Sequence, residues 1–270
     1  MKNSIQNQPF TGAYSIKVDL TPFHAGDRVY LPDTPVLQDK YITAIGVYWN
    51  ASAVQDPDGD NIGVNDLSDM YLTLVGLDNV NFFQDIPMGY FRQKNRQLNI
   101  NRYIFLPNCY ITLGNPTDKN FLLMTFFYTD KIDCNVLPDA KETNIQPLEV
   151  PVFDSPYNQF YLPDNRILVN RKIRNIYSSY IETKAGQPIS SSPSGYTLVD
   201  PKNTFLTIIY RNDIVIYRMP CAFLQQFDSN FELRFDNVSY DLPSSYVELS
   251  KDVAENVGNK ACYFNFEYES

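Results

Sequence analysis

Apolar and polar residues alternate along short stretches of this chain, and similar stretches recur in the same order in its two halves. Residues 14–20 alternate with the period of a strand that has one face in water, and residues 148–153 are their counterpart. The tetrapeptide Tyr-Leu-Pro-Asp follows each of them, at 30–33 and at 161–164. Its proline keeps the preceding leucine extended, and its aspartate favours a turn. The pattern predicts one β-rich unit that is built twice.

Four further blocks agree between the halves in the same order. They are the strands 41–49 and 172–181, the hairpin strands that begin at Tyr71 and Phe205, the Leu-Pro-x-x-Tyr segments at 106–113 and 242–249, and the last strands at 123–128 and 263–268. Short strands separated by turn signals are typical of a sandwich, and we count about seven per half. We therefore expect an all-β fold of two tandem, internally duplicated antiparallel β-sandwiches.

Local signals add detail to this expectation. Asp78-Asn79 and Asn212-Asp213 have the residue types of hairpin turns, and Pro151 suits an edge strand or a bulge because it lacks an N–H. One short helical turn is expected near residues 251–256. The side chains expected in the two cores are Leu72, Leu74, Phe126, Leu206, Ile208 and Phe266.

The same pattern divides the chain. The expected divisions are a flexible N-terminal arm at 1–13, a first sandwich at 14–130, a linker at 131–147 and a second sandwich at 148–270. Two long loops, residues 50–69 and 182–202, differ between the halves although the strands around them agree. Loops of this length in a compact domain are commonly functional, so we expect them to contact other subunits or the exterior.

Composition and charge narrow the classes of protein. The 20 Tyr and 18 Phe suit pleated, half-buried strands, and the net charge of −9 is spread over both halves, which excludes a nucleic-acid-binding domain by gross charge. The first residues lack an apolar segment, and no apolar run reaches the length of a membrane span, so we expect neither a secretory signal nor a transmembrane segment. Four cysteines without metal-ligand spacing are expected to be reduced thiols of a protein made in the cytoplasm: Cys109, Cys134, Cys221 and Cys262.

Asp56, Asp58 and Asp60 place three carboxylates in one glycine-containing loop. Calcium prefers oxygen ligands at such spacing, but no glutamate follows at the twelfth position of an EF-hand, and the second half has no equivalent acids. The interpretation favoured by the sequence is an acidic loop in solvent, with a calcium site as the alternative.

The remaining candidates for chemistry are isolated. His24, the single histidine, lies outside any catalytic motif, and residues 1–130 contain no glutamate that could form a glycosidase acid pair. Two basic clusters could contact phosphates, but a solvated strand face is the favoured interpretation: Arg92, Lys94, Arg96 and Arg102, and Arg166, Arg171, Lys172 and Arg174. We therefore predict no catalytic, cofactor-binding or metal-binding residue, no specific nucleic-acid site, and no enzymatic activity.

Two similar β-sandwiches in one chain, behind a polar arm, resemble the tandem (double) jelly-roll capsid proteins of icosahedral viruses and bacteriophages. The resemblance covers residues from about 14 to 270 and lies in architecture and duplication, so no site residue is carried over. It implies upright jelly rolls of eight strands each, whereas about seven are counted here. It further implies a phage major capsid protein that forms pseudo-hexagonal homotrimers within a shell, contacts other virion proteins, and resides in the virion after synthesis in the host cytoplasm.

Two other classes of function remain open at this stage. One is another phage structural component, such as a tail or portal-vertex ring subunit, a decoration protein or a spike. The other is a carbohydrate-binding β-sandwich protein or a glycosidase, in which exposed aromatic residues would stack on sugars.

Overall fold

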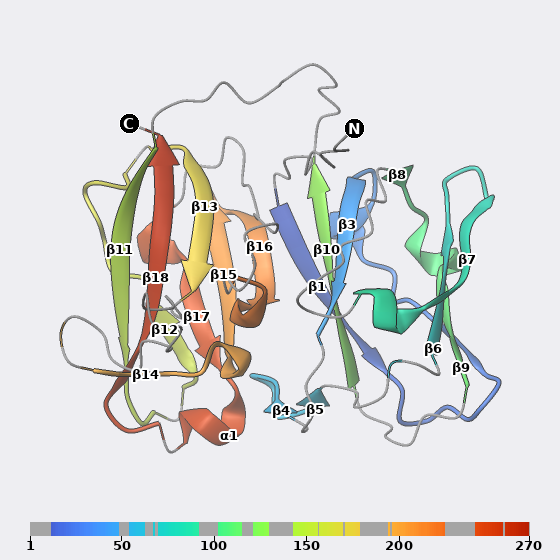
Figure 1. Cartoon of the computed structure of the whole chain (residues 1–270), viewed down its shortest axis with the longest axis horizontal. Helices are drawn as coiled ribbons and strands as arrows, with labels where there is room; N and C mark the ends of the chain where they lie inside the picture. The colour runs from blue at the N-terminus through green and yellow to red at the C-terminus, as the bar shows by residue number, and fades with distance from the viewer. Residues whose placement is uncertain are drawn as a thin grey trace, which may run out of the picture.

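The computed structural model describes most of the chain and has an all-β architecture. The described residues are 12–48, 54–62, 67, 70–91, 102–114, 121–129, 143–155, 157–169, 171–178, 194, 196–224, 241–255 and 257–269. Figure 1 shows two groups of strands side by side along the longest axis of the molecule, the C-terminal half on the left and the N-terminal half on the right.

The first half builds two layers of strands. One layer has the order β1-β10-β3-β8 and the other has the order β2-β9-β6-β7. The strands of the first layer are β1 (Gly12–Asp19), β10 (Phe121–Thr129), β3 (Tyr41–Val47) and β8 (Arg102–Tyr103). Those of the second are β2 (Arg28–Tyr30), β9 (Tyr110–Leu113), β6 (Met70–Val75) and β7 (Asn81–Pro87).

The second half builds two layers in orders that correspond to those of the first half. Each strand of the second half can be matched to the strand of the first half that comes at the same point along the chain. With this matching, the order β11-β18-β13 corresponds to β1-β10-β3, and the order β12-β17-β15-β16 corresponds to β2-β9-β6-β7. Among the described residues of the second half, no strand corresponds to β8. The strands are β11 (Thr143–Val152), β18 (Lys260–Glu269), β13 (Ile173–Ser178), β12 (Gln159–Tyr161), β17 (Tyr246–Leu249), β15 (Thr204–Tyr210) and β16 (Asp213–Pro220).

The repeated tetrapeptides occupy corresponding places in these orders. Tyr30 ends β2 and packs on Tyr110, and Tyr161 ends β12 and packs on Tyr246, with ring centroids 5.6 and 5.9 Å apart. The leucine that follows each tyrosine is buried. The two segments are therefore used in the same way by the two halves.

The two halves share one sheet. Strands β1 and β16 pair in parallel, with Ala13 opposite Ile216 and Tyr14 opposite Tyr217. This pairing joins a layer of the first half to a layer of the second and produces a 10-stranded sheet. Its ten strands include the short strands β4 (Val54–Gln55) and β5 (Asn61–Ile62), which lie beside β10.

Each half has its own hydrophobic core, and the six predicted core positions are confirmed. Leu72, Leu74 and Phe126 lie in one core and Leu206, Ile208 and Phe266 in the other, all at 0% exposure. The core of the second half also includes three residues of the first half, Ala13, Ala44 and Phe127. The halves are thus packed together through apolar side chains as well as through the shared sheet.

Several predicted boundaries are wrong, because pairing with distant segments extends strands beyond the alternating pattern. Strand β1 already begins at Gly12, inside the expected arm, and β11 begins at Thr143, inside the expected linker. The loop at 50–69 contains β4 and β5, and the loop at 182–202 contains β14 (Thr197–Leu198) and the first residues of a 3-10 turn at Pro201–Asn203. The two-residue strand β8 was not predicted, because two residues carry no readable periodicity.

Two other local predictions are confirmed, and the position of one hairpin turn is wrong. Strand β11, which contains Pro151, lies at the edge of its sheet, as predicted, and α1 (Lys251–Ala254) is the predicted helical turn. The second hairpin turn is formed by Arg211 and Asn212, not by Asn212 and Asp213. Both have positive φ, 48° and 69°, as a two-residue turn between twisted strands requires.

Candidate functional site at the junction of the two halves

The two halves meet at the start of β1. The rings of Tyr14 and Tyr217 stack with centroids 4.8 Å apart, and the hydroxyl of Tyr128 donates to the carbonyl of Val215 at 3.3 Å. A Cβ on Gly12 would lie 2.5 Å from both the Val215 oxygen and the Tyr128 ring. Glycine is therefore required at this position for the halves to meet.

An acidic hairpin from the first half fits beside this junction. Strands β4 and β5 pair with each other, and the turn between them is held by Asp56, whose carboxylate accepts the N–H groups of Asp58 and Asp60 at 2.9 and 2.8 Å. Gly59 has φ +92°, a conformation that residues with a Cβ rarely adopt. The turn directs three carboxylates to one side of the hairpin.

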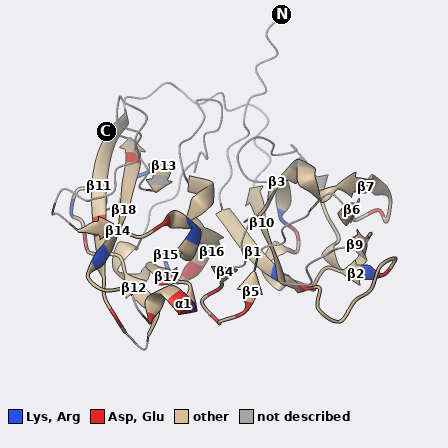
Figure 2. Cartoon of the chain, turned by 60° about the horizontal axis from the view of Figure 1, so that its bottom comes forward, with Lys and Arg blue, Asp and Glu red and all other residues tan. Residues whose placement is uncertain are grey.

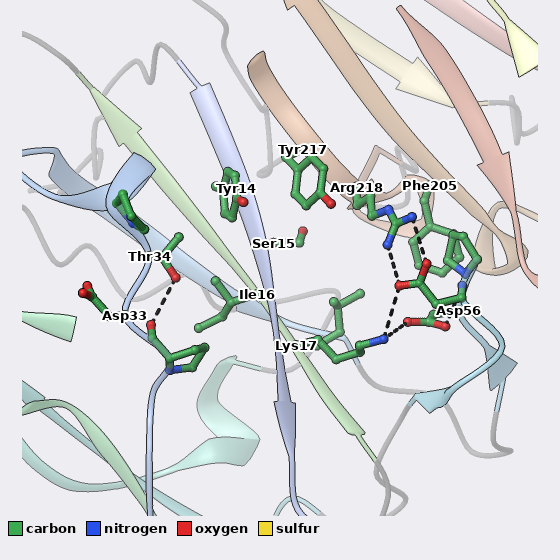
Figure 3. A pocket seen from close by; sticks show the side chains of 15 residues that line it. Tyr14, Ser15, Ile16, Lys17, Asp33, Thr34, Asp56, Phe205, Tyr217 and Arg218 are labelled. Carbon is green, nitrogen blue, oxygen red and sulfur yellow. Dashed lines mark hydrogen bonds and ion pairs between the residues drawn. The ribbon is translucent and has the colours of Figure 1, made fainter. Parts of the chain in front are cut away.

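Two cations, one from each half, meet these carboxylates (Figure 3). Lys17 Nζ lies 2.7 Å from Asp56 Oδ2 and 3.3 Å from Asp58 Oδ2, and it also donates to Asp60. The guanidinium of Arg218 donates two hydrogen bonds to Asp58, at 2.6 and 3.1 Å, and two to Glu248, each at 3.0 Å. Together these side chains form what we call the junction network: Lys17, Asp56, Asp58, Asp60, Arg218 and Glu248.

The electrostatics of the network follow from burial and pairing. Burial opposes the positive charges of Lys17 and Arg218, but their hydrogen bonds to carboxylates outweigh it, so the pKa of each is raised. The hydrogen bonds from Arg218 lower the pKa of Asp58. Burial raises the pKa of Glu248, although the same guanidinium counteracts it. This difference is consistent with exposure, since the Glu248 side chain is 8% exposed and that of Asp58 is 45% exposed.

Backbone and side-chain hydrogen bonds also fasten the acidic hairpin to the second half. The Asn158 amide donates to the Pro57 carbonyl at 2.7 Å, and the Lys251 N–H donates to the Asp56 carbonyl at 3.2 Å. Nearby, the Tyr48 hydroxyl donates to the Lys202 carbonyl at 2.8 Å. The hairpin therefore acts as a clasp from one half onto the other.

A pocket of about 350 Å³ opens beside the network. Its wall includes the stacked pair Tyr14 and Tyr217, the cations Lys17 and Arg218, and Asp33 on the opposite side. Both cations are already bound to carboxylates of the network. The arrangement is suited to holding the two halves at a fixed angle. Within the described residues it presents no nucleophile beside a general base.

The acidic loop is neither of the two things that the sequence suggested. It is not a loop in solvent, because Asp56 is 4% exposed and its carboxylate is paired with Lys17. The Lys17 ammonium lies among the carboxylates where the calcium alternative would place a metal ion. Among the described residues no group of three or more His, Cys, Asp or Glu side chains is placed to hold a metal.

The other sequence candidates that the structure describes lie outside the junction network. His24 is 80% exposed, with Nδ1 3.8 Å from Asp27, and the described basic residues Arg166, Arg171 and Lys172 are exposed. Arg92, Lys94 and Arg96 lie outside the described residues, as do the side chains of Arg102 and Arg174. The structure thus brings none of the described ones, His24, Arg166, Arg171 and Lys172, into the junction network.

Three of the four cysteines are described, and all three are free and buried, as expected of reduced thiols. Burial raises the pKa of Cys109 to about 11 and that of Cys221 to about 12, so both are protonated and unreactive near neutral pH. Cys134 lies outside the described residues.

Sequence reasoning missed the partners of the acidic hairpin. Lys17 looked like an ordinary polar residue of an alternating strand, and Arg218 and Glu248 belong to strands of the other half. In the structure, Arg218 has φ 44° and its N–H donates to Thr207 Oγ1, so it lies at a bulge that aims its side chain. A bulge cannot be recognised from residue types alone.

Comparisons with protein families and with curated proteins find no match to this chain. Within the described residues, the structure has no helix of the length and apolarity needed to cross a membrane.

Proposed function

We propose that each half is a jelly roll and that the chain is a virion structural protein, namely a phage major capsid protein. In this proposal three copies form a trimer with a pseudo-hexagonal outline within a shell, next to other virion proteins. The observation that carries the proposal is that both halves arrange their strands in corresponding orders in two layers.

The strand orders support the jelly-roll assignment directly. A jelly roll has eight strands in two sheets and is common in viral capsid proteins. The orders β1-β10-β3-β8 and β2-β9-β6-β7 supply eight strands in the first half. Seven described strands of the second half follow the same scheme.

The junction supports a role as a rigid building block. The shared sheet, the core residues contributed by both halves and the junction network all fix one half against the other. A subunit that tiles a closed surface needs a constant angle between its parts, because small angular errors would prevent closure. Two domains that move relative to each other would not keep this angle constant.

The proposal is tested by the assembly state of the purified full-length protein. Light scattering and analytical ultracentrifugation at micromolar concentration should show trimers or larger closed particles, and electron microscopy should show shells or three-lobed capsomers. A monomer at all pH and salt values would overturn the proposal. Rings of high cyclic order would instead indicate a tail or portal-vertex component.

A carbohydrate-binding function is the second candidate, and exposed aromatic residues favour it. Tyr30 and Tyr161 are 56% and 61% exposed, each beside a second tyrosine, and Tyr157 is 77% exposed. Such rings can stack on sugars. If these residues instead contact neighbouring subunits, titration with a panel of glycans should give no binding. Saturable glycan binding by a monomer would favour the carbohydrate-binding function.

A further inference from the structure

Two sheet edges are open at opposite ends of the molecule. Strand β7 ends the order β2-β9-β6-β7, and β11 ends the order β11-β18-β13. Among the described residues, no strand pairs with the outer edge of either one. Figure 1 shows β11 at the left end of the long axis and β7 at the right end. Open edges of this kind are templates for pairing with another chain.

These open edges correspond to the two strands that are joined inside the chain. Strand β16 is last in its order as β7 is, and β1 is first in its order as β11 is. We propose that β7 of one copy pairs in parallel with β11 of the next copy, repeating between copies the junction that β16 and β1 form within the chain. This inference rests on the self-assembly in the proposed function, and it names the surface that mediates it.

The register of the proposed pairing follows from shared neighbours. Tyr14 lies opposite Phe126, and Gln146 lies opposite Phe266, and both phenylalanines are fully buried on corresponding strands. Gln146 therefore corresponds to Tyr14, and Ile145 corresponds to Ala13. Ala13 is 0% exposed under the second half, whereas Ile145 is 62% exposed. The contact that covers Ala13 within the chain would cover Ile145 between copies.

Corresponding bulges fix the register on the other strand. Asp85 and Arg218 both have positive φ, and their N–H groups donate to Thr73 and Thr207, each at 3.2 Å. The residue before each bulge is Gln84 in β7 and Tyr217 in β16. Since Tyr217 lies opposite Tyr14, Gln84 of one copy should lie opposite Gln146 of the next.

The proline after Gln146 limits how far this pairing can run. Pro147 has no N–H to donate, so a ladder from Ile145 and Gln146 would end there. The pairing inside the chain is equally short, with two residue pairs. The length of the proposed contact therefore agrees with its template.

The surface around the open edge is more polar than its counterpart inside the chain. By the same correspondence, Phe127 in the core of the second half is replaced by Glu267 on the outer strand face. Interfaces between subunits that fold before they associate are more polar than interiors. A head-to-tail contact of this kind closes into a ring when its rotation allows, and three copies would place six halves around one axis.

Charge at the open edges gives the proposal a distinctive signature. The two cations of the junction network, Lys17 and Arg218, correspond to Glu149 and Asp85. The proposed contact brings these two carboxylates toward each other, where they repel. Association should therefore strengthen with added salt, which screens like charges.

Cysteine cross-linking tests the register. In full-length protein carrying Gln84→Cys and Gln146→Cys together, mild oxidation should produce covalent multimers that end at a closed ring. Each single variant should give dimers at most. The pair Gln84→Cys with Ile167→Cys is the matched control, because Ile167 is exposed and is not part of β11. Absence of cross-linking in assembled double variant would overturn the inference and leave the proposed function standing.

Side-chain variants test the energetics. Ile145→Asp should raise the concentration needed for half-association at least about tenfold, and Ile167→Asp should leave it unchanged. Glu149→Lys should strengthen association by pairing with Asp85 of the next copy, whereas Asp164→Lys makes the same change of charge elsewhere and should not. Thermal melting of each variant separates loss of folding from loss of association.

The outcomes distinguish the two proposals. Assembly that is indifferent to Ile145→Asp and Glu149→Lys contradicts the β7–β11 contact alone. A wild-type protein that stays monomeric at every salt concentration contradicts both the contact and the capsid function.

Discussion

Arg218 joins the two halves at the level of single side chains. Its guanidinium binds Asp58 of the acidic hairpin and Glu248 of β17 at the same time, with four hydrogen bonds. Planar, bidentate recognition of two carboxylates is a property of arginine that lysine lacks. Its positive φ shows that the backbone bends to place it there.

Removing this guanidinium should be costly, because Glu248 would remain buried without its partner. We expect Arg218→Ala to lower the free energy of unfolding by about 2 kcal/mol, less than for a fully buried pair since the Arg218 side chain is partly exposed. Urea unfolding measures this, with Arg166→Ala as a control on an exposed arginine. A double-mutant cycle with Glu248→Gln should show coupling, and additive effects would contradict the pairing.

The lowered pKa of Asp58 predicts how the junction responds to acid. A carboxyl group with a depressed pKa stabilises the fold above its ordinary pKa, here 3.8, and this contribution is lost as the pH falls through the lower folded value. The free energy of unfolding of the wild type should therefore exceed that of Asp58→Asn by about 1 kcal/mol at pH 7, a small value because Asp58 is partly exposed. This difference should shrink below pH 3.8.

The pKa of Glu248 is shifted in the opposite direction, upward, so the pH dependence of the wild type alone would mix the effects of the two carboxyl groups. Its raised pKa means that protonation favours the folded state, so its contribution is present at low pH and is lost as the pH rises through that folded value. Melting curves of wild type and Asp58→Asn across pH isolate the Asp58 effect. A constant difference from pH 7 to pH 2.5 would show that Asp58 does not titrate with the junction.

At the level of elements, alternation was a good guide wherever a strand packs one face on its own half. Strand β1 was predicted from it, β3, β6, β10 and β15 were predicted from the blocks repeated between the halves, and the six expected core side chains are buried. The pattern failed where tertiary contacts decide. It placed the second hairpin turn one residue late, and it gave no sign that residues 54–62 form a hairpin clasped by the other half.

Truncation in the two cores should have similar effects, because both positions are fully buried in corresponding strands. We expect Leu72→Ala and Leu206→Ala each to cost about 2–5 kcal/mol. Chemical denaturation of the two variants provides the measurement, with Leu77→Ala on an exposed side chain as control. Losses below about 0.5 kcal/mol would remove these leucines from the cores.

For the whole molecule, the shared sheet and the shared core predict that the two halves unfold together. Phe127 of the first half packs edge-on against Phe223 of the second, with centroids 6.2 Å apart, and belongs to the core of the second half. The sequence could not reveal this coupling, since an aromatic residue in a strand looks the same whichever core receives it. The duplication in the sequence suggested two sandwiches but not one continuous sheet.

Coincident unfolding transitions would confirm the coupling. The chain has one tryptophan, Trp49, in the first half, whereas far-UV circular dichroism reports on both halves. We expect the fluorescence and dichroism curves in denaturant to share one midpoint in the wild type. Two separated transitions would show that the halves fold independently despite the junction.

The parallel pairing of β1 with β16 has a consequence for the order of events during translation. The ribosome releases β1 first, but its partner strand emerges only after most of the chain has been made, because Ala13 pairs with Ile216. Throughout that interval the nascent first half displays an unsatisfied strand edge and the uncovered side chain of Phe127. Until the second half is synthesised and covers this edge, the nascent chain would be bound by a chaperone or would mispair with another nascent chain on the same polysome.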